Sequence, residues 1–127
     1  MKKLIRNDEL GNYIRTINSE GSFKNNIKIK LPTALLFNVR INTKAMMERY
    51  EIVGEMLDNL KKEFESDGKL DGLKIKEEFC VEWTKRFDDI MKQKSEFDFV
   101  PIQQKDFIDR DDLSWSEIDF LLLMTEE

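Results

Sequence analysis

Histidine is absent from this 127-residue sequence, and cysteine occurs once, as Cys80. Without histidine the chain has no Ser-His or Cys-His catalytic pair, no imidazole metal ligand and no ordinary proton shuttle at neutral pH. One cysteine excludes an internal disulfide and a cysteine-based zinc site. We therefore expect no catalytic residues, no metal site and no cofactor, and we predict that the chain is not an enzyme.

Glycine, proline and long apolar runs are also scarce. With 5 glycines and 2 prolines the chain has few helix breakers, which favours long helices. The longest candidate for membrane insertion, residues 121–124, is far short of the ~18 apolar residues of a transmembrane helix. The basic N-terminus is followed by Asn7, Asp8 and Glu9 instead of the apolar segment of a signal peptide. These features predict no membrane partner and a cytoplasmic location.

Charge is abundant and unevenly distributed. Charged residues make up 37% of the sequence and the net charge is −5. Residues 1–50 carry 10 basic and 4 acidic side chains, a net +6, whereas residues 51–127 carry 11 and 22, a net −11. Either the basic half folds against the acidic half, or the two form surfaces of opposite sign, one of which docks a partner.

The strongest structural signal is a heptad pattern that follows Pro32. Apolar residues recur at alternating spacings of three and four, with Thr43 the one weak position, and predict a helix over 33–66 about 50 Å long. Its apolar edge must be covered by another helix of this chain or by a second copy. The predicted seam is Leu36, Val39, Thr43, Met46, Tyr50, Val53, Leu57, Leu60 and Phe64. We assign self-association, and a possible homodimer, to six of these residues: Met46, Tyr50, Val53, Leu57, Leu60 and Phe64.

Shorter patterns define the rest of the fold. Further helices are predicted over 8–19, over 76–93 and over 115–124, the last with a capping box formed by Ser114 and Glu117. Short strands are predicted over 1–6, 27–31 and 96–102, with the second and third as a candidate pair. Gly68 suits the end of the long helix, and Asp71-Gly72 suits a type I′ turn.

Together these elements predict a mainly α fold with minor β structure (α+β). A long antiparallel helical hairpin would carry two short helices and a small two-stranded sheet, in one domain over residues 1–127. Helix 115–124 is apolar nearly all round, so it either fills the core or meets a partner.

Three candidate chemical sites do not fit the residues that would form them. Residues 67–78 resemble a calcium-binding EF-hand loop, but Lys69 and Ile75 occupy two positions that require oxygen ligands. Adjacent carboxylates such as Asp88 and Asp89 alternate with basic residues, as on a solvated helix face. Cys80 lies beside Trp83 on an apolar stripe, which predicts a buried packing thiol and not a reactive one.

The acidic C-terminal part is the candidate docking surface. Residues 96–127 hold 10 acidic and 2 basic side chains, a composition that could occupy the basic groove of a nucleic-acid-binding protein or simply form a soluble tail. Direct nucleic-acid binding is not expected, because aromatic stacking partners are scarce around basic residues such as Lys24, Arg40 and Arg49. The candidate partner-binding residues are Asp106, Asp109, Asp111, Asp112, Trp115 and Asp119.

Two segments carry a family resemblance. One is Leu31-Pro32 before the heptad-patterned stretch from Phe37 to Phe64 with its Asp-Gly tip, and the other is the ending from Asp112 to Leu121, with Glu96 to Ile102 between them. In order and spacing they resemble a family of small uncharacterised proteins of tailed phages and prophages of low-GC Gram-positive bacteria. The resemblance implies a phage origin but transfers no activity and no catalytic residues.

The function expected from these observations is a non-enzymatic phage-encoded module that binds a host or phage protein. It would act through the long heptad-patterned helix and the apolar C-terminal helix, in the host cytoplasm or in the virion. The alternative is an anti-CRISPR-like inhibitor of a bacterial defence system, whose acidic surface blocks a nucleic-acid-binding channel.

Overall fold

The computed structural model describes residues 1–18 and 31–126. The predicted α+β class is confirmed, because a mainly helical chain carries two small antiparallel sheets, one of β1 with β4 and one of β2 with β3. In chain order the elements are β1 (Lys2–Arg6), α1 (Asn7–Asn18), α3 (Thr33–Ser66), β2 (Leu70–Asp71), β3 (Lys74–Ile75), the short 3-10 helix η1 (Glu77–Phe79), α4 (Cys80–Lys92), β4 (Lys94–Asp98), the 3-10 helix η2 (Gln104–Asp106) and α5 (Trp115–Leu123).

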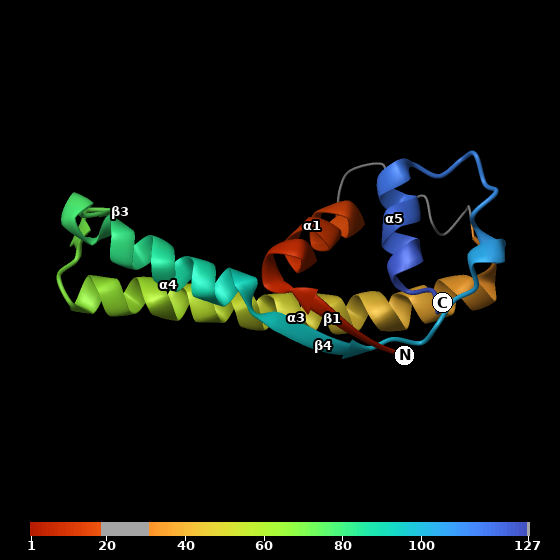
Figure 1. The fold of residues 1–127 in the computed structure, drawn as a ribbon, viewed down its shortest axis with the longest axis horizontal. Coiled ribbons are helices and arrows are strands. Elements are labelled where there is room, and N and C mark those ends of the chain that lie inside the picture. The colour runs from red at the N-terminus through yellow and green to blue at the C-terminus, as the bar shows by residue number, and fades with distance from the viewer. Residues whose placement is uncertain (19–30, 127) are drawn as a thin grey trace.

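Helix α3 is the axis of the molecule, and the other elements lie along it (Figure 1). It begins after Pro32, whose fixed φ suits the start of a helix, and it ends at Ser66 before Gly68, which has a φ of +71°. Helix α4 runs back antiparallel along its C-terminal half, while α1 and α5 lie over its N-terminal half (Figure 1). The predicted helical hairpin is therefore present, with a head at one end and a two-helix arm at the other.

The core lies in the head. Apolar side chains of α1, of the first half of α3, of β1 and β4, and of the C-terminal segment meet there and are almost completely buried, which supplies most of the folding free energy of a small protein. The largest fully buried side chains of this cluster are Phe107, Phe120, Ile5, Leu10, Met46, Leu121 and Met124.

The sheet of the head pairs the chain's first strand with β4. Lys2 pairs with Asp98 and Arg6 with Lys94 in an antiparallel register, which corrects the expected pairing of 27–31 with 96–102. Strand β4 runs from Lys94 to Asp98. Pro101 follows it and has no N–H to donate to a neighbouring strand. Residues 27–30 of the expected strand lie outside the described part of the chain, and Leu31 is a buried bend residue.

The tip of the arm is a hairpin, but its turn differs from the predicted one. Strands β2 and β3 pair Asp71 with Lys74, so the central residues are Gly72 and Leu73 and not Asp71 and Gly72. Gly72 has a φ of +64°, and no described residue other than glycine has a positive φ. A type I′ turn needs positive φ at both central residues, so the expectation was wrong; glycine in the first central position matches type II′.

An aromatic cluster holds α4 against α3. The ring of Trp83 packs edge-on against that of Phe64, with centroids 5.1 Å apart, and the Phe87 ring lies 6.2 Å from Trp83. Arg86 forms an ion pair with Glu63 at 2.6 Å beside this cluster. Cys80 is the first residue of α4 and is exposed, so the prediction of a buried thiol was wrong.

The buried face of α3 differs from the predicted seam at several positions, where the residue before the predicted one points to the interior. Val39, Met46, Val53, Leu60 and Phe64 are buried as expected, but Leu35 and Asn42 replace Leu36 and Thr43 on the buried side. Tyr50 is 39% exposed, and Arg49 lies closer to the protein interior. The face turns because β4 and the segment after it offer hydrogen-bonding partners to Asn42 and Arg49.

Asn42 is bound at both ends of its amide. Its Nδ2 donates to the carbonyl oxygen of Val100, and its Oδ1 accepts from the Val100 N–H, both at 2.8 Å. These two hydrogen bonds satisfy the N–H and the carbonyl group of Val100, which lies beyond the end of β4. The side chain is 1% exposed, so water cannot replace these bonds.

A second buried polar chain joins four elements. Arg49 Nε donates to Ser95 Oγ at 2.8 Å, and Ser95 Oγ donates to Asn7 Oδ1 at 2.9 Å. Asn7 in turn donates from Nδ2 to the Ile90 carbonyl and from its backbone N–H to the Gln93 carbonyl, at 2.8 and 2.9 Å. These carbonyls end α4, so the chain fixes the arm to the head.

Replacing Asn42 by alanine is expected to lower the free energy of unfolding by about 2–3 kcal/mol, because both Val100 backbone groups lose their buried partner. Asn59→Ala, on the exposed side of the same helix, is the matched control and should change it by less than about 0.5 kcal/mol. Urea unfolding followed by circular dichroism measures both. Equal effects of the two substitutions would contradict the role assigned to Asn42.

Gly54→Ala is expected to raise the free energy of unfolding by about 0.5–1 kcal/mol. Gly54 lies inside α3, and an added Cβ would meet nothing within 4 Å. Gly68→Ala should instead destabilise, because its φ of +71° strains an L-residue although space is also free there. Thermal and urea unfolding of the two variants should therefore shift in opposite directions.

Candidate functional site

The acidic segment between η2 and α5 is held at both ends by buried apolar side chains. Phe107 is completely buried and Leu113 is 8% exposed, while the residues between them point outward. The Ile108 N–H donates to the Gln104 carbonyl at 2.9 Å, and the Arg110 N–H to the Phe107 carbonyl at 3.2 Å. The two anchors thus present Asp109 to Asp112 at the surface of the head.

A capping box sets where α5 begins and therefore where Trp115 lies. Ser114 Oγ accepts from the Glu117 N–H at 3.2 Å, and a Glu117 carboxylate oxygen accepts from the Ser114 N–H at 3.0 Å, as predicted. Trp115 is the first residue of the helix and is 84% exposed. The C-terminal turns of α5 instead fill the core through Phe120, Leu121 and Met124.

A hollow lies where the acidic segment meets α5. It has a volume of about 570 Å³ and is lined by Ile108, Asp109, Arg110, Asp111, Leu113, Trp115 and Ile118. Ile108, Leu113 and Ile118 form the apolar part of its lining together with the exposed Trp115. Asp109 and Asp111 give it an acidic rim. An exposed indole is uncommon on a free surface, and tryptophan is enriched among residues that dominate binding energy.

The charges of the segment are not equivalent. Arg110 Nε lies 3.3 Å from Asp112 Oδ1, so the one arginine of the segment is engaged by a neighbouring carboxylate. Among the described residues no hydrogen bond or ion pair engages Asp109 or Asp111. The hollow therefore keeps a negative rim that a cation of a partner could approach.

The structure brings together three of the six predicted partner-binding residues. Asp109, Asp111 and Trp115 line the hollow, and Asp112 lies beside them in its pair with Arg110. Asp106 is exposed at the end of η2, and Asp119 is exposed one helical turn after Trp115. Ile108, Leu113 and Ile118 were not predicted; the only sequence signal for them was an apolar residue on each side of the acidic run.

Asp119 also acts on Tyr13 of α1. The Tyr13 ring packs 5.9 Å from that of Phe120, so α1 and α5 are in contact at this point. Burial raises the pKa of the Tyr13 hydroxyl above its ordinary value of 10.0, and the negative charges of Glu9 and Asp119 raise it further.

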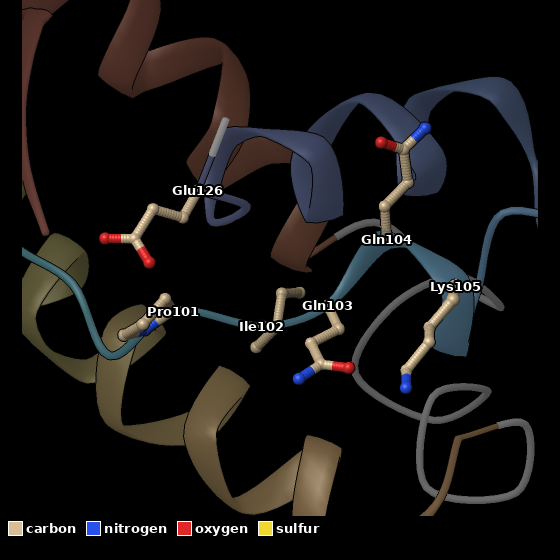
Figure 2. Close-up of a pocket in the computed structure, with 6 residues that line it drawn as sticks. All are labelled: Pro101, Ile102, Gln103, Gln104, Lys105 and Glu126. Carbon is tan, nitrogen blue, oxygen red and sulfur yellow. The ribbon is translucent and has the colours of Figure 1, made fainter.

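A second hollow, of about 350 Å³, lies near the C-terminus and is shown in Figure 2. It forms where the Ile102 N–H donates to the Met124 carbonyl at 3.1 Å. Gln103 and Lys105 point to one side of the segment and Gln104 to the other, while the Glu126 carboxylate lies near Pro101 (Figure 2). The polar ends do not converge, so this hollow offers no acid–base pair.

The tip of the arm uses its charges within the fold. Lys69 occupies a position that an EF-hand loop reserves for an oxygen ligand. Its Nζ lies 3.0 Å from a Glu82 carboxylate oxygen and over the rings of Phe64 and Phe79. Among residues 1–18 and 31–126 no cluster of three or more His, Cys, Asp and Glu side chains could hold a metal ion.

Of the six residues assigned to self-association, four are buried within the chain and two are partly exposed. Met46, Val53, Leu60 and Phe64 are buried by α1, α4 and the rest of the head, so the chain itself covers this part of the seam. Leu57 is half-buried, and the Tyr50 ring lies over Gly11 of α1. Dimerisation through all six residues stays a prediction, and it would require the hairpin to open.

The basic residues considered for nucleic acid are not gathered in the described chain. Lys24, Lys28 and Lys30 lie outside the described residues, and Arg49 is engaged with Ser95. Arg40 and Lys44 are exposed one turn apart on α3.

No family model, no curated protein and no solved structure matches this chain. Within the described residues, no helix combines the length and the apolar character needed to cross a membrane.

Asp119→Asn is expected to lower the pKa of Tyr13 toward 10.0, because it removes one of the charges that raise it. Ultraviolet absorbance titration measures this shift in a Tyr50→Phe background, where Tyr13 is the only tyrosine left. A raised pKa of the folded state adds stability that is full below the unfolded value and is lost as the pH rises through the folded value. An unchanged titration in Asp119→Asn would contradict the placement of Asp119.

Proposed function

We propose that this chain is a non-enzymatic, phage-encoded protein-binding module that docks a basic surface of its partner onto the hollow beside Trp115. The observation that carries the proposal is an 84% exposed tryptophan at the edge of an apolar hollow whose rim carries Asp109 and Asp111. Apolar contact at the centre and charge at the rim is the usual anatomy of a protein interface.

The fold supports this role by keeping the surface rigid. Phe107 and Leu113 anchor the acidic segment, and the capping box fixes the start of α5, so the backbone that carries Trp115 is held in place before binding. The phage origin rests on the resemblance of the segments from Leu31 and from Asp112.

Trp115→Ala is expected to weaken partner capture by at least about tenfold, since tryptophan anchors commonly contribute about 2 kcal/mol or more. The tagged chain would be incubated with a lysate of a low-GC Gram-positive host, and the captured proteins quantified by mass spectrometry. Val81→Ala on α4 is the control, because Val81 is equally exposed, at 84%, but lies on the arm. A partner retained equally by both variants would refute the proposal.

Charge reversal tests the acidic rim separately. Asp109→Lys with Asp111→Lys should reduce the capture of the same partner and weaken its dependence on salt, because opposite charges steer and hold a basic surface. The double change Asp88→Lys with Asp89→Lys, on α4, is matched in charge and should leave capture unchanged. Binding that ignores the first pair, or responds equally to both, would exclude an acidic docking surface.

A narrower proposal, inhibition of a defence nuclease, is favoured by the exposed carboxylates from Asp106 to Asp119, which can imitate phosphates in a basic channel. The wild-type chain should then block DNA binding by a purified CRISPR nuclease, and the Asp109/Asp111 reversal should not. Incorporation of the chain into purified phage particles, without inhibition, would favour a virion role in its place.

A further inference from the structure

The side of α3 that faces away from the head and from α4 carries an exposed apolar row. Phe37 is 65% exposed, Ile41 43% and Ile52 44%, and the alanines Ala34 and Ala45 are exposed on the same side. At 100° per residue these five side chains lie within about 80° of one another and about 100–180° from the buried Met46. Large apolar side chains in a row on an exposed helix face are a feature of interfaces.

Charges beside this outer row change sign along the helix. Arg40 and Lys44 flank its first half, while Glu48 and Glu51 flank its second half, and all four side chains are exposed. Within the described residues none of these four forms an ion pair. Such a face complements a reversed copy of itself, since each basic turn would meet an acidic turn.

We propose that the outer face of α3 is the interface of an antiparallel homodimer of this chain. A two-fold axis near Lys44 and Ala45 places Phe37 of one chain beside Ile52 of the other, twice. The same register brings Arg40 of each copy within reach of Glu48 and Glu51 of its partner, and Lys44 within reach of Glu48, while the two Lys44 side chains meet near the axis. A parallel pairing would instead put like charges side by side, which is unfavourable.

This interface leaves the rest of the molecule as it is. The predicted seam stays buried in each chain, so the hairpin does not have to open for two copies to associate. The Trp115 hollow lies on α5 and on the segment before it, and not on the outer row, so the dimer is independent of the proposed partner-binding function.

Size-exclusion chromatography with light scattering tests the dimer. The wild-type chain should have twice the mass of a single chain at micromolar concentration, and Phe37→Asp should be a monomer with unchanged circular dichroism. Leu73→Asp, at the 88% exposed tip of the arm, is the control and should stay dimeric. A monomeric wild type, or a dimer that survives Phe37→Asp and fails with Trp115→Ala, would overturn the proposal.

Charge variants keep the test decisive should Phe37→Asp fail to fold. Arg40→Glu with Lys44→Glu should be monomeric, and so should Glu48→Lys with Glu51→Lys. An equimolar mixture of the two double variants should restore a dimer, because each supplies the charges that the other lacks. Dimers in both variants alone, or no dimer in the mixture, would rule out pairing through this face.

Cysteine cross-linking tests the orientation in a Cys80→Ser background. The positions Ala34 and Glu55 are about 30 Å apart on one helix but adjacent across an antiparallel pair. Oxidation should therefore link Ala34→Cys chains to Glu55→Cys chains in a mixture, and neither to itself. Efficient linking of Ala34→Cys chains to each other would indicate a parallel dimer and contradict the proposal.

Discussion

The structure depends on covering one face of a helix that is too long for any single neighbour. Helix α3 has 34 residues, and its buried apolar residues lie along one side. A helix of this length gains little from its own hydrogen bonds in water and is stabilised by packing of its apolar face. The chain supplies that packing in two sections, with α1, α5 and β4 over the first half and α4 over the second (Figure 1).

The junction of the two sections is polar and buried, which is what makes the head and the arm one unit. Asn7 and Ser95 link Arg49 of α3 to the last carbonyls of α4. A buried amide of this kind tolerates little movement, because each lost bond leaves a desolvated group. These hydrogen bonds join the arm to the head, and on the head the acidic segment lies at the surface between the buried Phe107 and Leu113.

The same packing explains why the candidate site lies where it does. Six of the nine residues of α5 are apolar, yet its first residue, Trp115, is exposed to solvent while Phe120 and Leu121 fill the core. Helical periodicity cannot place both sets of side chains inside when the capping box begins the helix at the edge of the head. Helix α5 thus fills the core with its C-terminal turns and leaves Trp115 exposed at its start.

Sequence patterns alone determined the elements of this protein: the bounds of α3, the capping box at Ser114, the antiparallel arm and the acidic ending all follow from local spacing and composition. Local spacing is reliable for these features because caps, turns and heptads act over a few residues. Only the tertiary structure decided that β1 pairs with β4, that Asn42 and Arg49 lie on the buried face in place of Thr43 and Tyr50, and that Cys80 is exposed. Each of these depends on a partner distant in the chain, since a polar side chain can be buried only where a Val100 or a Ser95 is present to bind it.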